Sequence, residues 1–218
     1  MICVSLGLDS VSGCLKALED IEFAEIRLDL MDVRPADIPA LFSAGRRLIA
    51  TCRPGKKNDG ERKELLLECI RNGAAYVDIE DDAGDGYRTC LLRAAGRMGT
   101  RAIVSYHDFD AVPPRLDLEN IIQKCLGYGA DYVKIACRAP SPSDAARLLG
   151  LLGEPRMKDR LIVVGMGESG RIVRILAPFL GSPFTYASLS PGAETAPGQL
   201  SADTLAGIYE RLEGALRR

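Results

Sequence analysis

The chain has 218 residues, of which 47% are hydrophobic, and it carries a formal net charge of −2 with a pI of about 5.6. This length can bury a sizeable core and fits one large α/β domain as readily as two small ones. Because the sequence has no basic run or basic amphipathic stripe, we expect neither nucleic acid nor an anionic membrane surface as a partner. A small molecule is the expected partner, and a homodimer is left open.

The cysteines and the N-terminal sequence indicate the cellular compartment in which the protein is expected. Seven cysteines are scattered along the chain, and no two form a CxxC pair. This supports neither a disulfide framework nor a zinc site, so we expect reduced, mostly packed thiols and no metal. The start, MICVSLGLDSVSGCLK, does not read as a signal peptide, and the longest uncharged stretch, residues 175–193, contains three prolines. We therefore expect a cytoplasmic protein that does not span a membrane.

Short apolar or β-branched runs recur at even intervals. They lie at residues 2–6, 24–30, 48–53, 76–80, 102–107, 132–136, 161–166 and 183–188. Segments of helical character lie between them, such as 61–72, 115–128 and 142–152, and most close on a glycine, as at Gly73, Gly99 and Gly129. This alternation predicts a (β/α)8 TIM barrel forming a single domain over residues 1–218. A doubly wound sheet is the alternative, because periodicity alone does not distinguish an open sheet from a closed one.

Polar residues gather toward the C-terminal ends of the predicted strands, where the active sites of barrel enzymes lie. They are Glu25, Arg27, Asp29, Arg53, Asp78, Glu80, His107 and Lys134. Those that share a strand are spaced by two, so they can point into the barrel while their neighbours face the helices. Structural ion pairs are the alternative interpretation, above all for Glu25, Arg27, Asp29 and Asp78.

Two of these residues suggest a reaction. Lys134 interrupts the apolar run ADYVKIAC, and burial near cations such as Arg27 and Arg53 would disfavour its charged form, which is the usual route to a nucleophilic lysine. His107 is the only histidine and follows IVSY at a strand end, where it can act as a general acid and base at neutral pH. Together they indicate carbonyl chemistry through an imine.

A glycine motif offers a different function. VVGMGESG places Gly165, Gly167 and Gly170 in the GxGxxG spacing of dinucleotide-binding folds, after a strand and before a helix. The acidic residue expected at the end of the next strand is missing from PFTYAS, so nicotinamide binding is disfavoured. Backbone N–H groups near this motif could still bind an anion.

Seven segments in order carry a resemblance over almost the whole chain. They are EIRLDL, TCRP, YVDIE, VSYHDF, DYVKIA, GMGESGRIVR and SPFTYAS with AETAPGQL. In this combination the chain resembles type I 3-dehydroquinate dehydratase, a shikimate-pathway enzyme of aromatic amino-acid biosynthesis. The resemblance implies a (β/α)8 fold and dehydration of 3-dehydroquinate to 3-dehydroshikimate through an imine, without metal or organic cofactor.

The resemblance also implies a role for each matched residue. Lys134 would be the Schiff-base lysine and His107 the general acid and base. Glu25, Arg27 and Arg53 would line the substrate site. Arg174 would hold the substrate carboxylate, with Thr195 and Gln199 closing over it from a Gly- and Pro-containing segment that could act as a lid.

The sequence departs from the family pattern at three places. The family usually has a Glu a few residues after the strand-three arginine, where this chain has Lys57, so the carboxylate that orients His107 is open; Glu80 is the first candidate and Glu61 the second. Val173 precedes Arg174 where Ser is common. Ile2 already begins the first strand, so we expect no N-terminal extension across the barrel floor.

Two other functions remain as alternatives. A class I aldolase of the same fold would also use a barrel lysine, but it would be expected to bind a phosphorylated substrate near the strand-seven glycines. A non-catalytic barrel with a binding or regulatory role would not need both Lys134 and His107.

Overall fold

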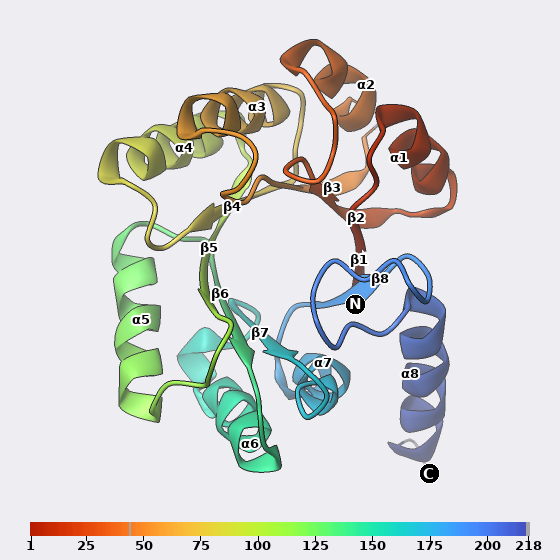
Figure 1. Ribbon diagram of the computed structural model, residues 1–218. Coiled ribbons are helices and arrows are strands. Elements are labelled where there is room, and N and C mark those ends of the chain that lie inside the picture. Colours follow the sequence, from red (N-terminus) through yellow and green to blue (C-terminus); the bar gives the residue numbers. More distant parts are fainter. Residues whose placement is uncertain (44, 217–218) are drawn as a thin grey trace. The chain divides into compact units, whose positions relative to one another are not determined.

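The computed structural model describes residues 1–43 and 45–216, within which eight strands alternate with eight α-helices (Figure 1). The strands are β1 (Ile2–Leu6), β2 (Phe23–Arg27), β3 (Arg47–Thr51), β4 (Tyr76–Glu80), β5 (Arg101–Asp108), β6 (Tyr132–Arg138), β7 (Leu161–Met166) and β8 (Thr185–Ser188). The α-helices are α1 (Val11–Ala17), α2 (Ile38–Phe42), α3 (Asp59–Arg71), α4 (Asp85–Met98), α5 (Arg115–Gly127), α6 (Pro142–Gly150), α7 (Arg171–Leu176) and α8 (Ala202–Leu216). Short 3-10 helices are η1 (Leu18–Asp20), η2 (Pro35–Asp37), η3 (Leu151–Gly153), η4 (Pro155–Met157) and η5 (Ala177–Leu180).

The strands form one sheet in the order β7-β6-β5-β4-β3-β2-β1-β8. From β1 to β7 each strand neighbours the next one in sequence, and the last strand, β8, pairs in parallel with the first, as in Cys3 opposite Tyr186. Strands that follow one another in this way and return to the first define the (β/α)8 barrel class. The predicted fold class is therefore confirmed, and the open doubly wound sheet is not.

The chain divides into two compact units, which are described separately. Unit 2 comprises Leu6–Tyr106 and Cys125–Tyr132, and unit 1 comprises Met1–Ser5, His107–Lys124 and the chain from Val133 onward. The assignment of residues 1–218 to a single catalytic domain stays a prediction.

In unit 2 the parallel strands β2, β3, β4 and the first part of β5 form the sheet, with Ala24 opposite Leu48 and Val77 opposite Ala102. Helices α3 and α4 lie side by side next to β3 and β4 (Figure 1). They bury residues at helical spacing, among them Leu66 of α3 and Leu91 and Ala95 of α4. The residues at the strand ends of unit 2 thus lie next to a packed apolar core.

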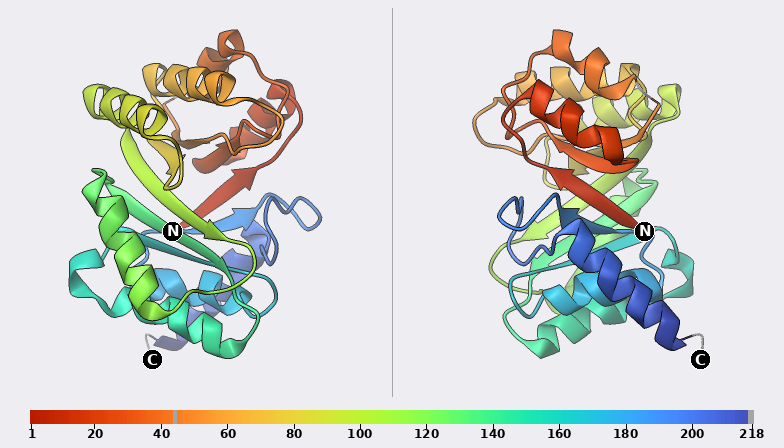
Figure 2. Two further views of the ribbon diagram at one scale, coloured as in Figure 1. Left: turned by 60° about the vertical axis from the view of Figure 1, so that its left-hand side comes forward. Right: turned by 90° about the vertical axis from the view of Figure 1, so that its right-hand side faces the viewer.

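In unit 1, β6 pairs in parallel with β7, and β1 pairs with β8. Strand β7 also approaches β8, and helix α8 lies beside α7 (Figure 2). The middle of this sheet is strongly apolar, since Val133, Ile135 and Val163 are fully buried. The few polar residues on the strands of unit 1 therefore have hydrophobic neighbours.

Two predicted strands run too far. The second was expected over 24–30 but ends at Arg27, because Leu30 N donates to the Arg27 carbonyl and turns the chain. Asp29 consequently lies in this turn and not on the strand. The third strand ends at Thr51, so Arg53 follows the strand instead of ending it.

The predicted helix-closing glycines are confirmed, since Gly73, Gly99 and Gly129 all have positive φ, a region that glycine enters without steric cost. None of the seven cysteines, all of which the structure describes, forms a disulfide, and only Cys90 among them is exposed, so the prediction of mostly packed thiols is confirmed. None of the helices in residues 1–43 and 45–216 has the length and apolar character needed to cross a bilayer.

Candidate functional site

In unit 2, strand β2 carries the carboxylate of Glu25, and the turn after β2 completes an ion pair between Arg27 and Asp29. Glu25 is 4% exposed and accepts a hydrogen bond of 3.0 Å from Thr51 Oγ1 on the adjacent strand. Arg27 donates through Nε and Nη2 to the two oxygens of Asp29, at 3.0 and 2.6 Å. The turn after β2 creates this bidentate pair, because it folds Asp29 back onto Arg27.

The charge of each partner is stabilised by the other. Burial alone would raise the pKa of Asp29, but the hydrogen bonds and positive charge of Arg27 outweigh it and lower that pKa below its ordinary value. Burial would likewise lower the pKa of Arg27, and its hydrogen bond with Asp29 and the charges of Glu25 and Asp29 raise it instead. Both groups are therefore ionised at neutral pH.

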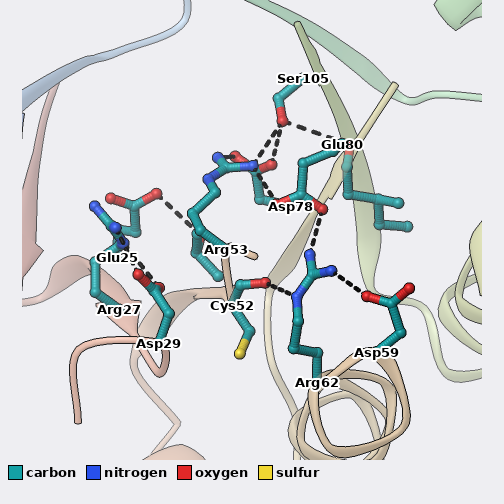
Figure 3. A network of polar contacts seen from close by, with 12 residues as sticks. Glu25, Arg27, Asp29, Cys52, Arg53, Asp59, Arg62, Asp78, Glu80 and Ser105 are labelled. Atoms are coloured by element: carbon teal, nitrogen blue, oxygen red, sulfur yellow. Dashed lines mark hydrogen bonds and ion pairs between the residues drawn. The ribbon is translucent and has the colours of Figure 1, made fainter. Parts of the chain in front are cut away.

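A network of polar contacts surrounds Arg53, immediately after β3 (Figure 3). Its Nη1 donates to Glu80 Oε1 at 2.9 Å and to Ser105 Oγ at 3.0 Å, and its Nη2 donates to Asp78 Oδ2 at 2.8 Å. Ser105 in turn donates to Asp78 Oδ1 at 2.5 Å. Burial would lower the pKa of Arg53, but the negative charges of Asp78 and Glu80 raise it above its usual range. The guanidinium is thus permanently charged and held in one orientation.

The other oxygen of Glu80 binds a residue that the sequence analysis did not single out. Arg62 Nη2 donates to Glu80 Oε2 at 2.8 Å, and Arg62 is only 3% exposed (Figure 3). A signal for it exists in the sequence, because Arg62 shares the three- and four-residue spacing of the buried Leu65, Leu66 and Cys69 of α3. Both oxygens of Glu80 thus accept hydrogen bonds from arginines, and its assignment as the carboxylate that orients His107 stays a prediction.

In unit 1, Lys134 lies on β6 and is 5% exposed, so a lysine does occupy an apolar strand interior. Its directly adjacent residues, Val133 and Ile135, are fully buried. Its Nζ lies 4.3 Å from the centre of the Tyr186 ring on β8, a cation–π distance. Tyr186 is a residue that the sequence analysis missed, because it lies 52 positions from the lysine and only tertiary packing brings the two together.

His107 is half-buried near the end of β5, as predicted. Its ring stacks on Phe109 with a centroid distance of 6.2 Å and an interplanar angle of 15°. The turn that places Phe109 is fixed by Asp108, whose Oδ1 accepts hydrogen bonds of 2.9 Å from the backbone N–H groups of Asp110 and Ala111. Phe109 itself is 63% exposed, so the ring that stacks on His107 lies at the protein surface.

Arg174 of α7 is fully buried. Its Nη1 and Nη2 donate to the carbonyl oxygens of Tyr186 and Pro197 at 3.3 and 3.4 Å, and its own carbonyl accepts a hydrogen bond from Tyr209. Both donated bonds are long, so the guanidinium holds these carbonyls only weakly. A carboxylate could replace such partners with stronger bonds, because its planar geometry matches the guanidinium fork.

The segment that carries Thr195 and Gln199 is fixed to the rest of unit 1. Thr195 donates through N to Gln199 Oε1 at 2.7 Å and through Oγ1 to Ser5 Oγ at 2.8 Å. Together with Arg171, residues 194–199 line a surface cavity of about 620 Å³. The two predicted residues are therefore brought together beside an open cavity.

The GxGxxG glycines are explained by close backbone packing. A Cβ on Gly165 would lie 2.6 Å from the carbonyl oxygen of Gly170, and one on Gly170 would lie 2.5 Å from the carbonyl oxygen of Met166. Gly167 has positive φ and donates to the Pro197 carbonyl at 3.2 Å. The spacing of these glycines thus allows the end of β7 to lie close to the segment before α7. Helix α7 itself has only six residues.

The residues at the family departures have structural partners. Lys57 donates through Nζ to the Met31 carbonyl at 2.9 Å and so ties together the segments that follow β3 and β2. Glu61 accepts from the backbone N–H of Asn58 in a capping box at the start of α3. Glu61 therefore has a helix-capping role, and the carboxylate that orients His107 stays a prediction.

The fold defines a class of protein. The strand order is that of a (β/α)8 barrel, the class in which active sites lie at the C-terminal ends of the strands, and each unit carries polar side chains at or near its strand ends. The family model for type I 3-dehydroquinase matches residues 2–215, so the chain belongs to this family, as the seven motifs predicted.

Individual relatives agree with the family. A 3-dehydroquinate dehydratase of Methanococcus maripaludis is 35% identical over 220 residues, covering 96% of this chain and 99% of the relative. The crystal structure of the 3-dehydroquinate dehydratase from Aquifex aeolicus is 28% identical, with a TM-score of 0.79 over 97% of this chain and 98% of that one. A type I enzyme from Clostridium difficile, at 23% identity, has a TM-score of 0.86 over 98% of this chain and 92% of that one, and shows the shared fold.

The predicted site residues divide between the units. Glu25, Arg27, Arg53 and Glu80 belong to unit 2, while Lys134, His107, Arg174, Thr195 and Gln199 belong to unit 1. Within unit 2 the structure brings Arg53 and Glu80 into direct contact, and within unit 1 it joins Thr195 to Gln199. Their roles toward a substrate stay predictions.

Proposed function

We propose that this protein converts 3-dehydroquinate to 3-dehydroshikimate and water through an imine with Lys134. The observation that carries the proposal is the position of Lys134 in a chain of the type I 3-dehydroquinase family, 5% exposed between fully buried neighbours on β6. The aromatic face of Tyr186 stabilises the cation that an imine becomes on protonation.

The reaction balances without an added reagent. The neutral amine of Lys134 attacks the ketone carbon, and the resulting carbinolamine takes a proton from His107 and loses water to give a protonated imine. This cation acidifies the adjacent C–H bond, from which His107 removes a proton, and His107 returns a proton to the departing hydroxyl. Water then hydrolyses the imine and releases the product with the free amine, so the net change is the loss of one water.

Binding follows from the charges already described. Arg174 would hold the substrate carboxylate through its planar fork, replacing its long bonds to the Tyr186 and Pro197 carbonyls. Glu25, Arg27 and Arg53 would line the substrate site, and Thr195 and Gln199 would cover the bound molecule. We propose the shikimate pathway as the metabolic setting and the cytoplasm as the location, with a homodimer to be tested by solution mass measurement.

Borohydride trapping tests the imine, because it reduces an imine to a stable amine. Treatment in the presence of 3-dehydroquinate should inactivate the protein and add one ligand mass within residues 121–138, at Lys134. Borohydride alone should do neither. The Lys134→Met variant keeps a similar length without the amine, so it should fold but form no adduct.

Three outcomes would overturn the proposal. An active protein that is never labelled would exclude the Schiff base. A label on Lys124, in the same peptide region, would move the chemistry away from β6. Labelling by a phosphorylated sugar, without turnover of 3-dehydroquinate, would favour an aldolase.

A further inference from the structure

Glu80 stands between two arginines that come from different elements of unit 2. Arg53, in the loop after β3, binds its Oε1 at 2.9 Å, and Arg62, near the start of α3, binds its Oε2 at 2.8 Å (Figure 3). The Arg62 and Glu80 side chains are only 4% and 10% exposed. The carboxylate of Glu80 therefore connects Arg53, the proposed substrate-binding arginine, to helix α3.

Arg62 holds the loop around Arg53 at a second point. Its Nε donates to the Cys52 carbonyl at 2.8 Å, which is the backbone group just before Arg53. Its Nη1 donates to Asp59 at 2.8 Å, but the Asp59 side chain is 78% exposed, so this third contact contributes little. Arg62 thus fixes both the backbone that leads into Arg53 and the carboxylate that binds its guanidinium.

The charges alternate along the network. Asp78, Arg53, Glu80 and Arg62 follow one another as anion, cation, anion and cation, each within 2.9 Å of the next. Removal of Arg62 would leave the two buried anions with one cation. Because an unbalanced buried charge is costly, the network would rearrange or admit water, and Arg53 is its most exposed member, with 16% of its side chain accessible.

We infer that Arg62 is a positioning residue for the substrate site, which holds Arg53 in its binding orientation through Glu80 and the Cys52 carbonyl. The inference rests on the proposed function in one respect, namely that Arg53 contacts the substrate. It adds a residue that does not itself touch the substrate.

A double-mutant cycle on KM tests this role. Arg62→Met should raise KM for 3-dehydroquinate about tenfold, the size of one lost charge-assisted hydrogen bond, while kcat at saturation changes less. In a Glu80→Gln background the same substitution should change KM much less, because residues acting through one contact are not additive. Arg62→Lys should give an intermediate KM, since one ammonium group cannot serve both Cys52 and Glu80 as the guanidinium does.

Arg88→Met is the matched control. Arg88 is also a buried arginine near a helix start, at 5% exposure, and it donates to the Asp81 and Ala83 carbonyls and lies 3.7 Å from the Tyr128 ring centre. Its loss should lower the melting temperature without raising KM. A merely structural role for Arg62 would give the same result as this control.

The outcomes separate the two proposals. An unchanged KM, or an equal effect of Arg62→Met in both backgrounds, would overturn the positioning role. If Arg62→Met does not fold, Arg62→Lys takes its place in the cycle. A crystal structure of the Arg62→Lys variant tests the positioning role without any measurement of activity, because Arg53 should no longer contact Glu80. An undisplaced Arg53 would refute the positioning role. A wild-type protein that is inactive on 3-dehydroquinate would instead refute the proposed function.

Discussion

Two groups of charged side chains are partly buried where opposite charges and directed hydrogen bonds compensate them. Arg27 with Asp29, and Arg53 with Asp78 and Glu80, show two forms of this compensation, one within a turn and one between strands. Such groups lose little when a ligand arrives, because they are already desolvated and oriented. Preorganisation of this kind is what a binding site for a polar substrate requires.

Replacement of His107 by Ala separates two roles at the residue scale. We expect kcat to fall by about 10²- to 10⁴-fold, the usual contribution of a general acid and base. Borohydride should still trap some adduct on Lys134, because water can carry protons slowly during imine formation. Steady-state kinetics and adduct mass measure both effects, and a near-native kcat would refute the assignment.

Tyr87 of α4 offers a test of a single buried hydroxyl. Its OH is buried without a hydrogen-bond partner in the described part of the chain, while its ring lies 5.2 Å from the Arg62 guanidinium. Tyr87→Phe keeps the ring and removes the unsatisfied group, so we expect the free energy of unfolding to rise by about 1 kcal/mol. Denaturant titration measures this change.

The control for Tyr87 is Tyr209→Phe. The Tyr209 hydroxyl donates to the Arg174 carbonyl at 2.9 Å, so its removal should cost about 1 kcal/mol. If both variants lose stability equally, the Tyr87 hydroxyl has a partner in solution.

At the scale of elements, contacts between glycines join β7 to the segment that carries Thr195 and Gln199. Gly198 has a φ of 77°, and a Cβ there would lie 2.3 Å from the Gly167 carbonyl oxygen. The adjacent Pro197 carbonyl accepts hydrogen bonds from both Gly167 N and Arg174. The part of the predicted lid around residues 197–198 is therefore packed onto β7, which argues against its free movement.

Gly198→Ala should break this contact. We expect a loss of unfolding free energy well above the cost of about 1 kcal/mol that positive φ alone imposes, and a higher KM because the Pro197 carbonyl beside Arg174 shifts. Gly192→Ala isolates the φ cost, since Gly192 has a φ of 86° and no atom within 4 Å of its Cβ position. Calorimetry of both variants gives the difference, and equal losses would show that the close approach does not matter.

At the scale of the whole molecule, the ion pairs make the free energy of unfolding depend on pH. The ordinary pKa of Asp29 is 3.8, and Arg27 lowers it in the fold despite the opposing effect of burial. A lowered folded-state pKa contributes stability that is fully present above pH 3.8 and is lost as pH falls through the folded-state value. Acid unfolding should therefore begin with carboxylates of this kind.

Asp29→Asn removes that contribution. At neutral pH we expect the variant to be less stable by about 2 kcal/mol, and near pH 3 the difference from the wild type should shrink, as urea titrations at the two pH values would show. Glu119→Gln, in the exposed Arg115 pair on α5, should have almost no effect at either pH. A difference that grows toward low pH would contradict the sign of the Asp29 shift.

The sequence by itself determined the features that depend on local periodicity and composition. The eight strands, the closing glycines after three helices and the family follow from short-range patterns, and so does the burial of Lys134 among β-branched residues. Reduced cysteines followed from their number and spacing. These properties are predictable because each depends on residues within a few positions of one another.

Tertiary structure alone decided which polar groups meet. Asp29 reaches Arg27 because the chain turns where an extended strand was expected, and Arg62 reaches Glu80 because α3 packs beside β4. The glycines of VVGMGESG make close backbone contacts with one another and with Gly198. Such contacts join residues far apart in the sequence, such as Gly167 and Gly198, which are 31 positions apart, and their distance is fixed only when strands and helices pack, so no local pattern could reveal it.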